Sequence, residues 1–465
     1  MDCCTHHGMA VRFDQMEYFM KIQKLMISVL CLGMAASVLG GCRTFGGTAA
    51  DTAVQTGSQP QSTVETAPMT ETQAAVTEAV IETVTETEAV TEIVTEVITE
   101  AVTEPIVIEP MRASFAAVGD AIVHEGIWME AQKTARNAGN GDEYDFSHLF
   151  RLVADDIAAY DLTFINQETL MAGAEYGYSA YPRFNTPREL ADAIIDTGFD
   201  VVNIANNHMM DMLPEGLAAT IDYWDTRPVT LIGGYKNTED YNTARIVTVN
   251  DIDIAFLSYC YGTNGLSMPA GYDMIIPYLD ETVIRAQTAA AKAQADFVVV
   301  SVHWGEDSYQ PLTEQQKTFA KIFAECGVDV VVGHHPHLIQ PMEWIEGTDG
   351  HRMLCAYSLG NYFSLMAKAE NMVGGMLSLD FVVEGEEKRL ENVQFIPTFF
   401  YYKTTFFGQT IMYQKDYTEE LAAKHGVQNY AVTNNKTAAQ LIAYTRSLIS
   451  EEFLPADFPQ KDAVS

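Results

Sequence analysis

Basic residues are scarce in this chain of 465 residues. It has 27 Lys and Arg against 63 Asp and Glu, which gives a formal net charge of −36. A surface of this sign repels nucleic acids and anionic lipid headgroups, so we expect no nucleic-acid partner. It does not exclude an anionic substrate, because a bound cation reverses the local field at a single site.

Cysteine is present, but not in a pattern that indicates a zinc site or a disulfide-rich protein. No C-x-x-C spacing occurs among the seven cysteines, which are Cys3, Cys4, Cys31, Cys42, Cys260, Cys326 and Cys355. The last three each lie beside an apolar run, which predicts buried and reduced side chains. Cys42 lies in a different setting.

The amino-terminal region has no apolar run long enough for a permanent membrane-spanning helix. Residues 25–38 are apolar, follow Lys21 and Lys24, and lead into Leu39-Gly40-Gly41-Cys42. This order is typical of a secretion signal, and its last four residues resemble a lipoprotein box. We therefore predict that residues 1–42 are a signal peptide with a lipidated Cys42; a plain signal peptide is the alternative. The protein is then extracytoplasmic and lipid-anchored to the outer face of the cell membrane.

Aromatic residues are nearly absent from residues 43–110, where Phe45 is the single one. The segment holds 12 acidic residues and one Arg, and it is rich in Thr, Val and Ala in a near-repeat of Val-Thr-Glu. Acids at four-residue spacing repel one another on a helix, and Thr and Val are poor helix formers. The composition therefore predicts a disordered linker that acts as a stalk. A binding tail for cations or basic wall components is the alternative.

From residue 111 onward, β-branched runs alternate with helical patterns. Buried strands are predicted at 114–118, 162–165, 201–204, 297–302 and 328–332. Helices are predicted at 186–198 and 313–327, each opened by a capping box, and at 281–295 and 436–452. Further strands are predicted at 246–249, 254–258, 351–357, 375–382 and 390–396. Alternating β/α units followed by hairpins predict one domain over 111–465, an α/β sandwich of mixed sheets.

Five predicted central strands stop at residues that can bind a metal ion. In open α/β sheets, ligands bind at the carboxyl ends of the strands. The five sets are Gly119-Asp120, Asn166-Gln167-Glu168, Asn206-Asn207-His208 with Asp211, His303-Trp304-Gly305-Glu306, and His334-His335-Pro336-His337. Because these ends share one edge of a sheet, we predict a single site there.

The residue types in these sets favour divalent cations. Carboxylates suit Mn, Fe or Mg, imidazole suits Zn, Mn or Fe, and an Asn carbonyl completes such a coordination sphere. A pair of ions activates water and holds both oxygens of a phosphoryl displacement, while a further His protonates the leaving group. Structural interpretations stay open: Asp120 as a turn residue, Glu168 as an exposed charge, His303 as a packed histidine. His124 is interpreted as an ordinary loop histidine, and Trp304 mainly as a packing residue.

Six motifs resemble, in order and spacing, the CapA-type capsule synthesis (poly-γ-glutamate synthesis) family, which is related to calcineurin-like metallophosphatases. They are Ala117-Val118-Gly119-Asp120, Asn166-x-Glu168, Ala205-Asn206-Asn207-His208-x-x-Asp211, His303-Trp304-Gly305-Glu306, Gly333-x-His335-Pro336-His337 and Ser358-Leu359-Gly360-Asn361. The resemblance covers about residues 112–400. It implies a four-layer αββα sandwich of the metallophosphatase type.

The resemblance also implies roles for single residues. The implied metal residues are Asp120, Glu168, Asn207, His303, His335 and His337, around two divalent cations. Catalysis is assigned to His208 and Asp211, and substrate binding to Asn166, Asn206, Trp304, Glu306 and Asn361. The chain departs from the metallophosphatases in two places: Asp120 is not followed by the usual Asp-x-His histidine, and Asn166-x-Glu168 replaces their Gly-Asp-x-x-Asp.

The leading hypothesis is a lipid-anchored, metal-dependent surface hydrolase. It acts in the synthesis, export or attachment of an anionic polymer such as poly-γ-glutamate, alone or with a membrane polymer synthase complex. One alternative is a generic extracytoplasmic metallophosphoesterase, which would release phosphate from small diesters. The other is a non-catalytic scaffold of a membrane polymer synthase.

Overall fold

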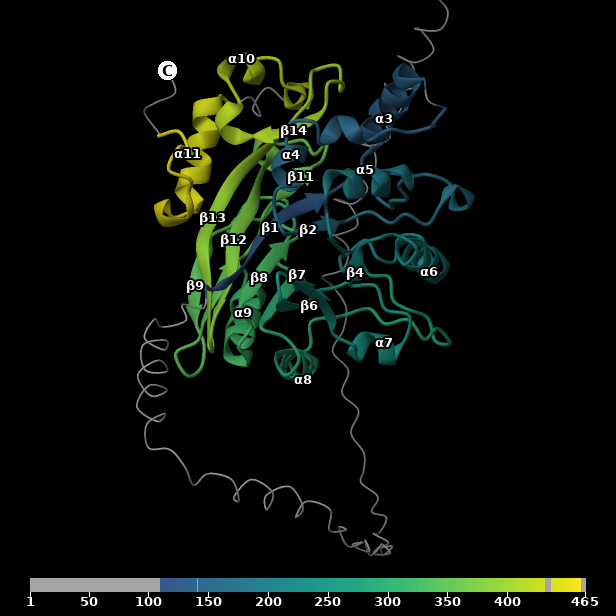
Figure 1. Cartoon of the computed structure of the whole chain (residues 1–465). Coiled ribbons are helices and arrows are strands. Elements are labelled where there is room, and N and C mark those ends of the chain that lie inside the picture. Colours follow the sequence, from purple (N-terminus) through teal and green to yellow (C-terminus); the bar gives the residue numbers. More distant parts are fainter. Residues whose placement is uncertain (1–108, 140, 431–435, 461–465) are drawn as a thin grey trace, which may run out of the picture. The chain divides into compact units, whose positions relative to one another are not determined.

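A computed structural model describes residues 109–139, 141–430 and 436–460 (Figure 1). All of these residues fall within one unit of the chain, Ala101–Ser465. The predicted signal peptide (1–42), the lipidated Cys42 and nearly all of the predicted stalk (43–110) lie outside the described residues.

The first sheet has eight strands and mixes parallel with antiparallel pairing. Strand β1 lies in its middle, parallel to β2 and antiparallel to β12. Across the sheet the order is β14 (Thr410–Tyr413), β13 (Glu387–Tyr401), β12 (Val373–Glu384), β1 (Met111–Ala121), β2 (Leu162–Gln167), β3 (Val201–Asn203) and β4 (Thr230–Ile232), and β11 (Asn361–Phe363) pairs with β1.

The second sheet has six strands, of which β6, β7, β8 and β10 are parallel neighbours. Its order is β5 (Arg245–Val249), β6 (Ile252–Cys260), β7 (Phe297–His303), β8 (Val330–His334), β10 (Arg352–Ala356) and β9 (Met342–Glu346). Strands β7 and β8 are continuous β-branched runs, as expected for strands buried on both faces.

The two sheets pack face to face, with helices outside them. Phe115 on β1 contacts Phe256 on β6, at 6.2 Å between ring centroids, and both belong to the main core. A second core forms where α8 (Glu281–Lys292) and α9 (Glu314–Cys326) cover the outer face of the second sheet. The other helices are α3 (Glu125–Ala138), α4 (Ala154–Ile157), α5 (Glu189–Thr197), α6 (Leu213–Trp224), α7 (Thr238–Asn242), α10 (Glu419–Ala422) and α11 (Ala438–Leu448) (Figure 1). The predicted four-layer αββα sandwich is confirmed.

One predicted capping box is confirmed and the other is wrong. The Thr313 side chain accepts from Gln316 N, and the Gln316 side chain accepts from Thr313 N, which opens α9. Helix α5 instead begins at Glu189, without a side-chain cap. Thr186 is fully buried, and its hydroxyl donates to Thr169 Oγ1, 2.8 Å away. The hydroxyl that was expected to cap α5 is therefore bonded to a residue outside the helix.

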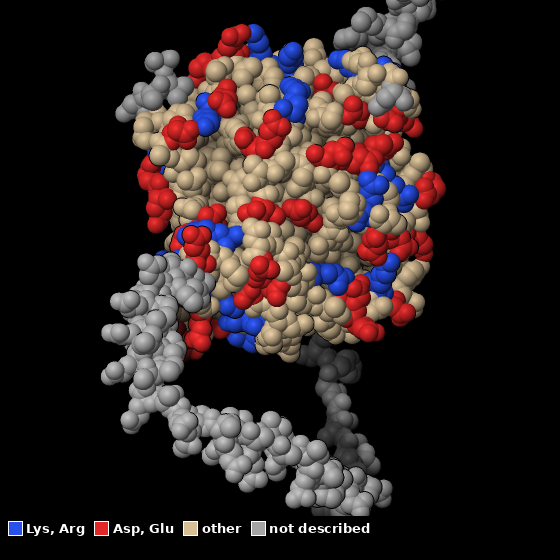
Figure 2. Space-filling model, viewed as in Figure 1, with Lys and Arg blue, Asp and Glu red and all other residues tan. Residues whose placement is uncertain are grey.

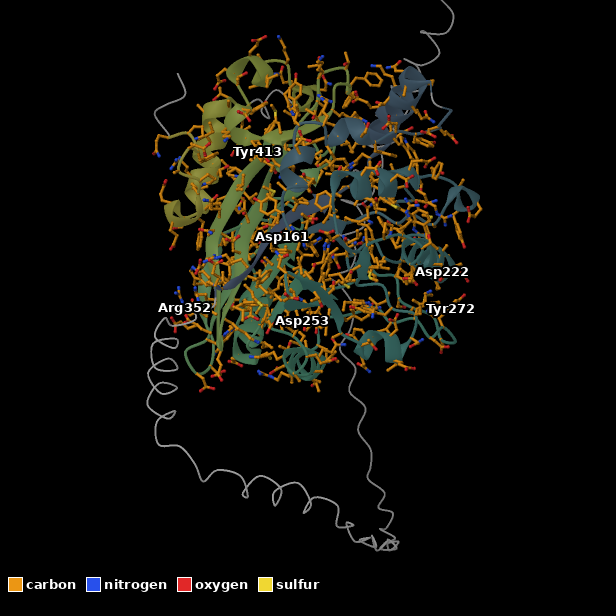
Figure 3. All side chains as sticks on the ribbon, in the orientation of Figure 1. Asp161, Asp222, Asp253, Tyr272, Arg352 and Tyr413 are labelled. Atoms are coloured by element: carbon orange, nitrogen blue, oxygen red, sulfur yellow. The ribbon has the colours of Figure 1, made fainter. Side chains whose placement is uncertain are left out.

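Four parallel strands begin directly after an aspartate whose carboxylate accepts a backbone N–H from the neighbouring strand. The N–H donors are those of Ser114, Thr163, Asp253 and Val298, at 2.7–2.9 Å. The acceptors are Asp161 before β2, Asp200 before β3, Asp296 before β7 and Asp329 before β8 (Asp161 is labelled in Figure 3). We call these four residues the amino-end aspartates; they satisfy donors that the sheets themselves leave free.

The surface carries the charge imbalance of the sequence. Figure 2 shows acidic side chains spread around the visible face of the domain, with fewer basic ones and a central area of uncharged residues. Many of the basic side chains are already paired with acids, as Arg285 is with Glu281 and Glu325. Among the described residues, ion pairing with acids thus accounts for most of the basic side chains.

Candidate metal centre at the carboxyl ends of the strands

Pairing in the first sheet places Asp120 beside two asparagines. Asp120 lies opposite Asn166 on β2 and opposite Asn361 on β11. Gly119, just before it, approaches Gly360 so closely that a Cβ at this position would lie 2.0 Å from the Gly360 carbonyl oxygen. Only glycine therefore allows β1 and the 360–363 segment to meet here.

Asp120 is fully buried and is surrounded by donors. Asn166 Nδ2 donates to its Oδ1 at 2.8 Å, and the backbone N–H of His335 donates to its Oδ2 at 3.2 Å. The imidazoles of His334 and His337 approach the two carboxylate oxygens at 3.2 and 3.1 Å. Burial raises the pKa of Asp120, but the contacts with His334 and His337 outweigh it and hold that pKa well below its usual range. Asp120 is therefore a carboxylate anion inside the protein.

Glu168 directly follows β2 and is 1% exposed. Its Oε1 lies 3.7 Å from His303 Nε2 and 3.7 Å from His337 Nε2, and among the described residues neither carboxylate oxygen has a hydrogen-bond partner. Burial raises the pKa of Glu168 well above its usual range, and the charge of His337 opposes that rise. A buried carboxyl without partners is costly for a folded protein, which points to a ligand rather than to a structural role.

Two groups of potential metal ligands share Glu168. One consists of Glu168, His303 and His335, and the other of Asp120, Glu168 and His337; in each group the candidate atoms lie within 4.8 Å of one another. The Nδ1 atoms of His303 and His335 are also buried without a hydrogen-bond partner among the described residues. These oxygen and nitrogen donors fit divalent cations, with Glu168 between the two groups.

Burial keeps two of the histidines in the form that binds metals. It lowers the pKa of His335 to about 3, helped by the charge of His337, and it lowers the pKa of His303 well below the usual range. Burial acts the same way on His337, but Glu168 and Asp120 outweigh it and raise the pKa of His337 to about 10. His303 and His335 are thus neutral, and a cation that binds at the second group must displace the proton from His337.

Asn207 is oriented toward this cluster. Its Oδ1 lies 3.0 Å from His303 Nε2, and its Nδ2 donates to Asn264 Oδ1 at 3.3 Å. Tyr261 packs on the same group, with its ring 4.6 Å from that of His335 between centroids. Asn264 therefore leaves the amide oxygen of Asn207, the atom that binds hard cations, facing the cluster.

His208 and Asp211 form a separate pair beside the cluster. His208 Nδ1 lies 2.7 Å from Asp211 Oδ2, and that oxygen also accepts from the Phe184 backbone N–H at 2.7 Å. The Phe184 ring packs edge-on against His208, 4.8 Å away between centroids. With Nδ1 engaged by the carboxylate, Nε2 of His208 is the nitrogen left for proton transfer.

The backbone of the His335-Pro336-His337 turn is unusual. His335 has φ +98° and His337 has φ +56°, in the left-handed region that residues other than glycine rarely adopt. Each such position costs on the order of 1–3 kcal/mol and is common at functional sites. Here the turn directs two imidazoles toward Glu168 and Asp120.

The cluster opens into a cavity of about 590 Å³. Its lining includes Glu168, His335 and His337 at the cluster and His208 and Asp211 beside it. Most of the other lining residues come from three loops, around residues 181–184, 261–266 and 305–307, and the rest are Ile122, His124, Asn207 and Met366. The site is thus reachable by a ligand from outside.

The structure gathers the six predicted metal residues (Asp120, Glu168, Asn207, His303, His335 and His337) around one buried cluster; that they bind metal stays a prediction. The predicted substrate residues are placed differently. Exposed Glu306 lines the cavity. Asn166 and Asn361 are buried and instead contact Asp120 and His337, while Asn206 accepts from His208 N and donates to Gln167 O.

Trp304 was wrongly predicted as a substrate contact. It has 0% exposure, lies in the second core, and donates its indole N–H to Tyr357 O at 2.9 Å. Successive side chains of a strand point to opposite faces, so His303 reaches the cluster and Trp304 points to the core under α9. The interpretation of Trp304 as a packing residue is the one that holds.

Two histidines that were given no role at the site also lie here. His334, which the sequence placed in a strand-end set but not among the metal residues, is the last residue of β8, contacts Asp120 and stacks on Phe164. His124 is partly buried, lines the cavity and accepts from Leu365 N. Burial lowers the pKa of His124 to about 4. The spacing Asp120-x-x-x-His124 was the available signal for it.

The fold and the site define a class: two-sheet α/β proteins with a buried carboxylate–imidazole centre at the carboxyl ends of their strands. A family model described as "Bacterial capsule synthesis protein PGA_cap" matches residues 114–365, which is more than half of the chain. The chain belongs to this family. The match includes all of the candidate site residues from Asp120 to Asn361.

Two curated relatives are also named for PGA or capsule biosynthesis. The chain is 31% identical over 179 residues to the "PGA biosynthesis protein CapA" of Bacillus subtilis, covering 38% of this chain and 46% of that protein. It is 30% identical over 179 residues to the "Capsule biosynthesis protein CapA" of Bacillus anthracis, covering 37% and 42%. The chain thus spans less than half the length of these relatives.

Solved structures show distant likeness. The calcineurin-like phosphoesterase YfkN from Bacillus subtilis is 12% identical with a TM-score of 0.37, covering 73% of this chain and 98% of that one. A phosphatase from Mycoplasma pneumoniae is 13% identical with a TM-score of 0.37, covering 62% and 94%. Within the described ranges, no helix has the length and hydropathy needed to cross a bilayer.

Proposed function

We propose that this protein is a metal-dependent hydrolase acting in the synthesis, export or attachment of an anionic capsule polymer of the poly-γ-glutamate type. The observation that carries the proposal is Glu168, a buried carboxyl with no hydrogen-bond partner among the described residues, set 3.7 Å from two imidazoles. Partnerless groups of this kind, next to a cavity, are characteristic of a ligand site.

The residues that would hold the cations are the two groups that share Glu168, with Asn207 beside them. Mixed carboxylate and imidazole donors fit two ions of Mn, Fe or Zn, and Mg is the alternative where oxygen ligands dominate. Such ions supply an activated water and polarise the bond to be cleaved. The protein's own contribution is a pair of neutral imidazoles, His303 and His335, and a second carboxylate, Asp120.

His208 is proposed as the proton donor to the leaving group. Asp211 holds its Nδ1 at 2.7 Å, so the ring orientation is fixed and Nε2 is left for the proton transfer next to the cavity. Asp211 is itself held by the Phe184 backbone N–H, which makes it a positioning residue.

The polymer is proposed from the names of the relatives, both of which act in PGA or capsule biosynthesis. The cell-surface location is proposed from the lipoprotein box at Cys42 and the acidic linker that follows it. A Cys42→Ala chain should lose incorporation of labelled fatty acid and appear in the soluble fraction. Continued membrane retention without labelling would reject the lipid anchor.

The first experiment measures metal content and hydrolysis by the purified protein and by its His335→Ala/His337→Ala variant. The substrates are γ-linked glutamate oligomers and bis(p-nitrophenyl) phosphate. We expect one or two equivalents of Mn, Fe or Zn in the parent, and loss of both metal and turnover in the variant. Turnover of the diester alone would indicate a generic phosphoesterase instead.

A cellular experiment separates the enzyme from the scaffold. A strain that lacks the gene should lose polymer, and the His335→Ala chain should not restore it. Unchanged polymer in the deletion strain rejects the polymer role, and restoration by His335→Ala rejects catalysis in favour of a scaffold.

A further inference from the structure

Arg183 stands apart from the other residues around the cavity. Of the described residues that line it, Arg183 alone is a Lys or Arg, and its side chain is exposed. Within the described part of the chain, its guanidinium has no hydrogen bond or ion pair, whereas nearby Arg188 donates to the Met171 and Ala172 carbonyls. A free guanidinium is notable on a chain with 63 acidic residues.

The backbone that carries Arg183 is tied to the proposed proton donor. The next residue, Phe184, donates its N–H to Asp211 Oδ2 and packs its ring on His208. Arg183 itself donates its N–H to Ala180 O at 3.2 Å. Although the Arg183 side chain is exposed, the backbone from which it extends is therefore held in place relative to His208.

Four acidic residues line the cavity together with Arg183. They are Glu168, which is shared by the two groups of potential metal ligands, Asp211, which holds His208, and Glu306 and Asp307 on the 305–307 loop. Asp307 accepts from the Ser308 hydroxyl, and among the described residues neither 305–307 acid pairs with Arg183. Arg183 thus supplies the one guanidinium among the described residues that line the cavity, and its fork matches a two-oxygen anion.

We propose that Arg183 binds a carboxylate of the substrate, next to the bond that is cleaved, and so selects an anionic polymer. This inference rests on the proposed function, since a γ-linked glutamate chain carries a free carboxylate on every residue. A phosphate would offer the same two-oxygen anion. The two sources are separated by the substrates used in the test.

The test compares the metal-loaded full chain with its Arg183→Gln, Arg183→Lys and Arg136→Gln variants. Arg136 is a matched control, because it is an exposed arginine in the last turn of α3 and does not line the cavity. Each protein is assayed for hydrolysis and for equilibrium binding of a labelled γ-linked glutamate oligomer. The methyl ester of that oligomer and bis(p-nitrophenyl) phosphate are the comparison substrates.

We expect Arg183→Gln to raise KM and Kd for the oligomer by about tenfold or more, with kcat changed less than about threefold. Arg183→Lys should recover part of the affinity, since it keeps the charge and loses the fork. Arg136→Gln should match the parent, and the methyl ester should bind the parent and Arg183→Gln equally.

Three results overturn the inference: an unchanged Kd in Arg183→Gln, an equal loss with the methyl ester, or an effect confined to the phosphodiester. A parent that binds the oligomer without cleaving it rejects the hydrolase proposal. In that case weaker binding by Arg183→Gln still supports the carboxylate site, so the two failures are distinguishable.

Discussion

Carboxylate side chains lie at both ends of the parallel strands, but their hydrogen bonding differs between the two ends. At the amino ends, Asp161, Asp200, Asp296 and Asp329 each accept a backbone N–H from the neighbouring strand. At the carboxyl ends, Glu168 is buried with neither oxygen partnered among the described residues.

The difference distinguishes structural from functional polar groups. A carboxylate that accepts a backbone N–H satisfies a donor that the sheet would otherwise leave free, so it is explained by the fold alone. A buried carboxyl without a partner lowers stability and is explained only by something that binds to it. The same contrast holds for histidine: His425 has both ring nitrogens engaged with backbone atoms, while His303 and His335 each keep one buried nitrogen free among the described residues.

The largest effect is expected for Glu168→Gln, which keeps the shape and removes the charge. Metal affinity and hydrolysis should fall by more than about a hundredfold. This is a larger loss than is usual for residues that only hydrogen-bond a metal ligand, because Glu168 would bind the metal directly. The free energy of unfolding of the metal-free protein should change little, because the cost of burying the Glu168 carboxyl opposes its attraction to His337. Metal analysis and urea unfolding check this; Asp200→Asn is the control. Retained metal with a large loss of stability would remove the contrast between the two ends.

Next in size is His208→Gln. We expect kcat to fall about 10²- to 10⁴-fold while metal content stays at the parent level, because His208 contacts Asp211 rather than the metal groups. Asp211→Asn should give a smaller loss. If His208→Gln also empties the site of metal, His208 is a ligand and the cluster extends further than the two groups around Glu168.

A smaller effect is expected from pH at His425. Its Nδ1 accepts the Val427 N–H at 3.1 Å, and its Nε2 faces the Phe400 carbonyl at 3.1 Å, so the ring is neutral. Burial lowers its pKa from 6.5 to about 4. As the pH falls, the unfolded chain therefore takes up this proton before the folded protein does. The contribution of the neutral His425 ring to the free energy of unfolding is complete above pH 6.5 and is lost as the pH falls toward 4. The loss is about 3 kcal/mol.

The measurement for His425 is urea unfolding at pH 7 and pH 4.5. The His425→Gln variant should be less stable than the parent at pH 7 and should lose less stability between the two values. Equal pH dependence in the two proteins would show that other groups account for acid sensitivity. Activity of the metal-loaded protein at pH 7 should be unaffected.

The smallest effect is expected for Asp200→Ala at the amino ends. It removes the acceptor of the Thr163 N–H and hydroxyl, at 2.9 and 3.0 Å. The free energy of unfolding should fall by about 1 kcal/mol, since solvent reaches this end and replaces part of the bond. Metal content and kcat should be unchanged, as measured beside Glu168→Gln. Loss of metal in Asp200→Ala would mean that the two ends are coupled.

Local chemistry explains which predictions held. The capping box at Thr313 formed because both of its partners lie within four residues of each other. The one at Thr186 failed because Thr169, distant in sequence and close in space, took the hydroxyl. The same limit applies to the site: residue types and strand ends indicated Asp120, Glu168 and His337, whereas the part played by Asn166 and Asn361 depends on strand pairing that no local pattern contains.

The sequence by itself determined the class of fold, the edge of the sheet that carries the chemistry, and the residues that gather there. It could do so because strand periodicity, capping and ligand chemistry are properties of short segments. Only the tertiary structure decided which polar groups are satisfied. Glu168 has no hydrogen-bond partner among the described residues, the amino-end aspartates have theirs, Trp304 faces the core and Arg183 lines the cavity. Each of these depends on atoms brought together from distant parts of the chain, and that is where hydrogen bonding and desolvation are decided.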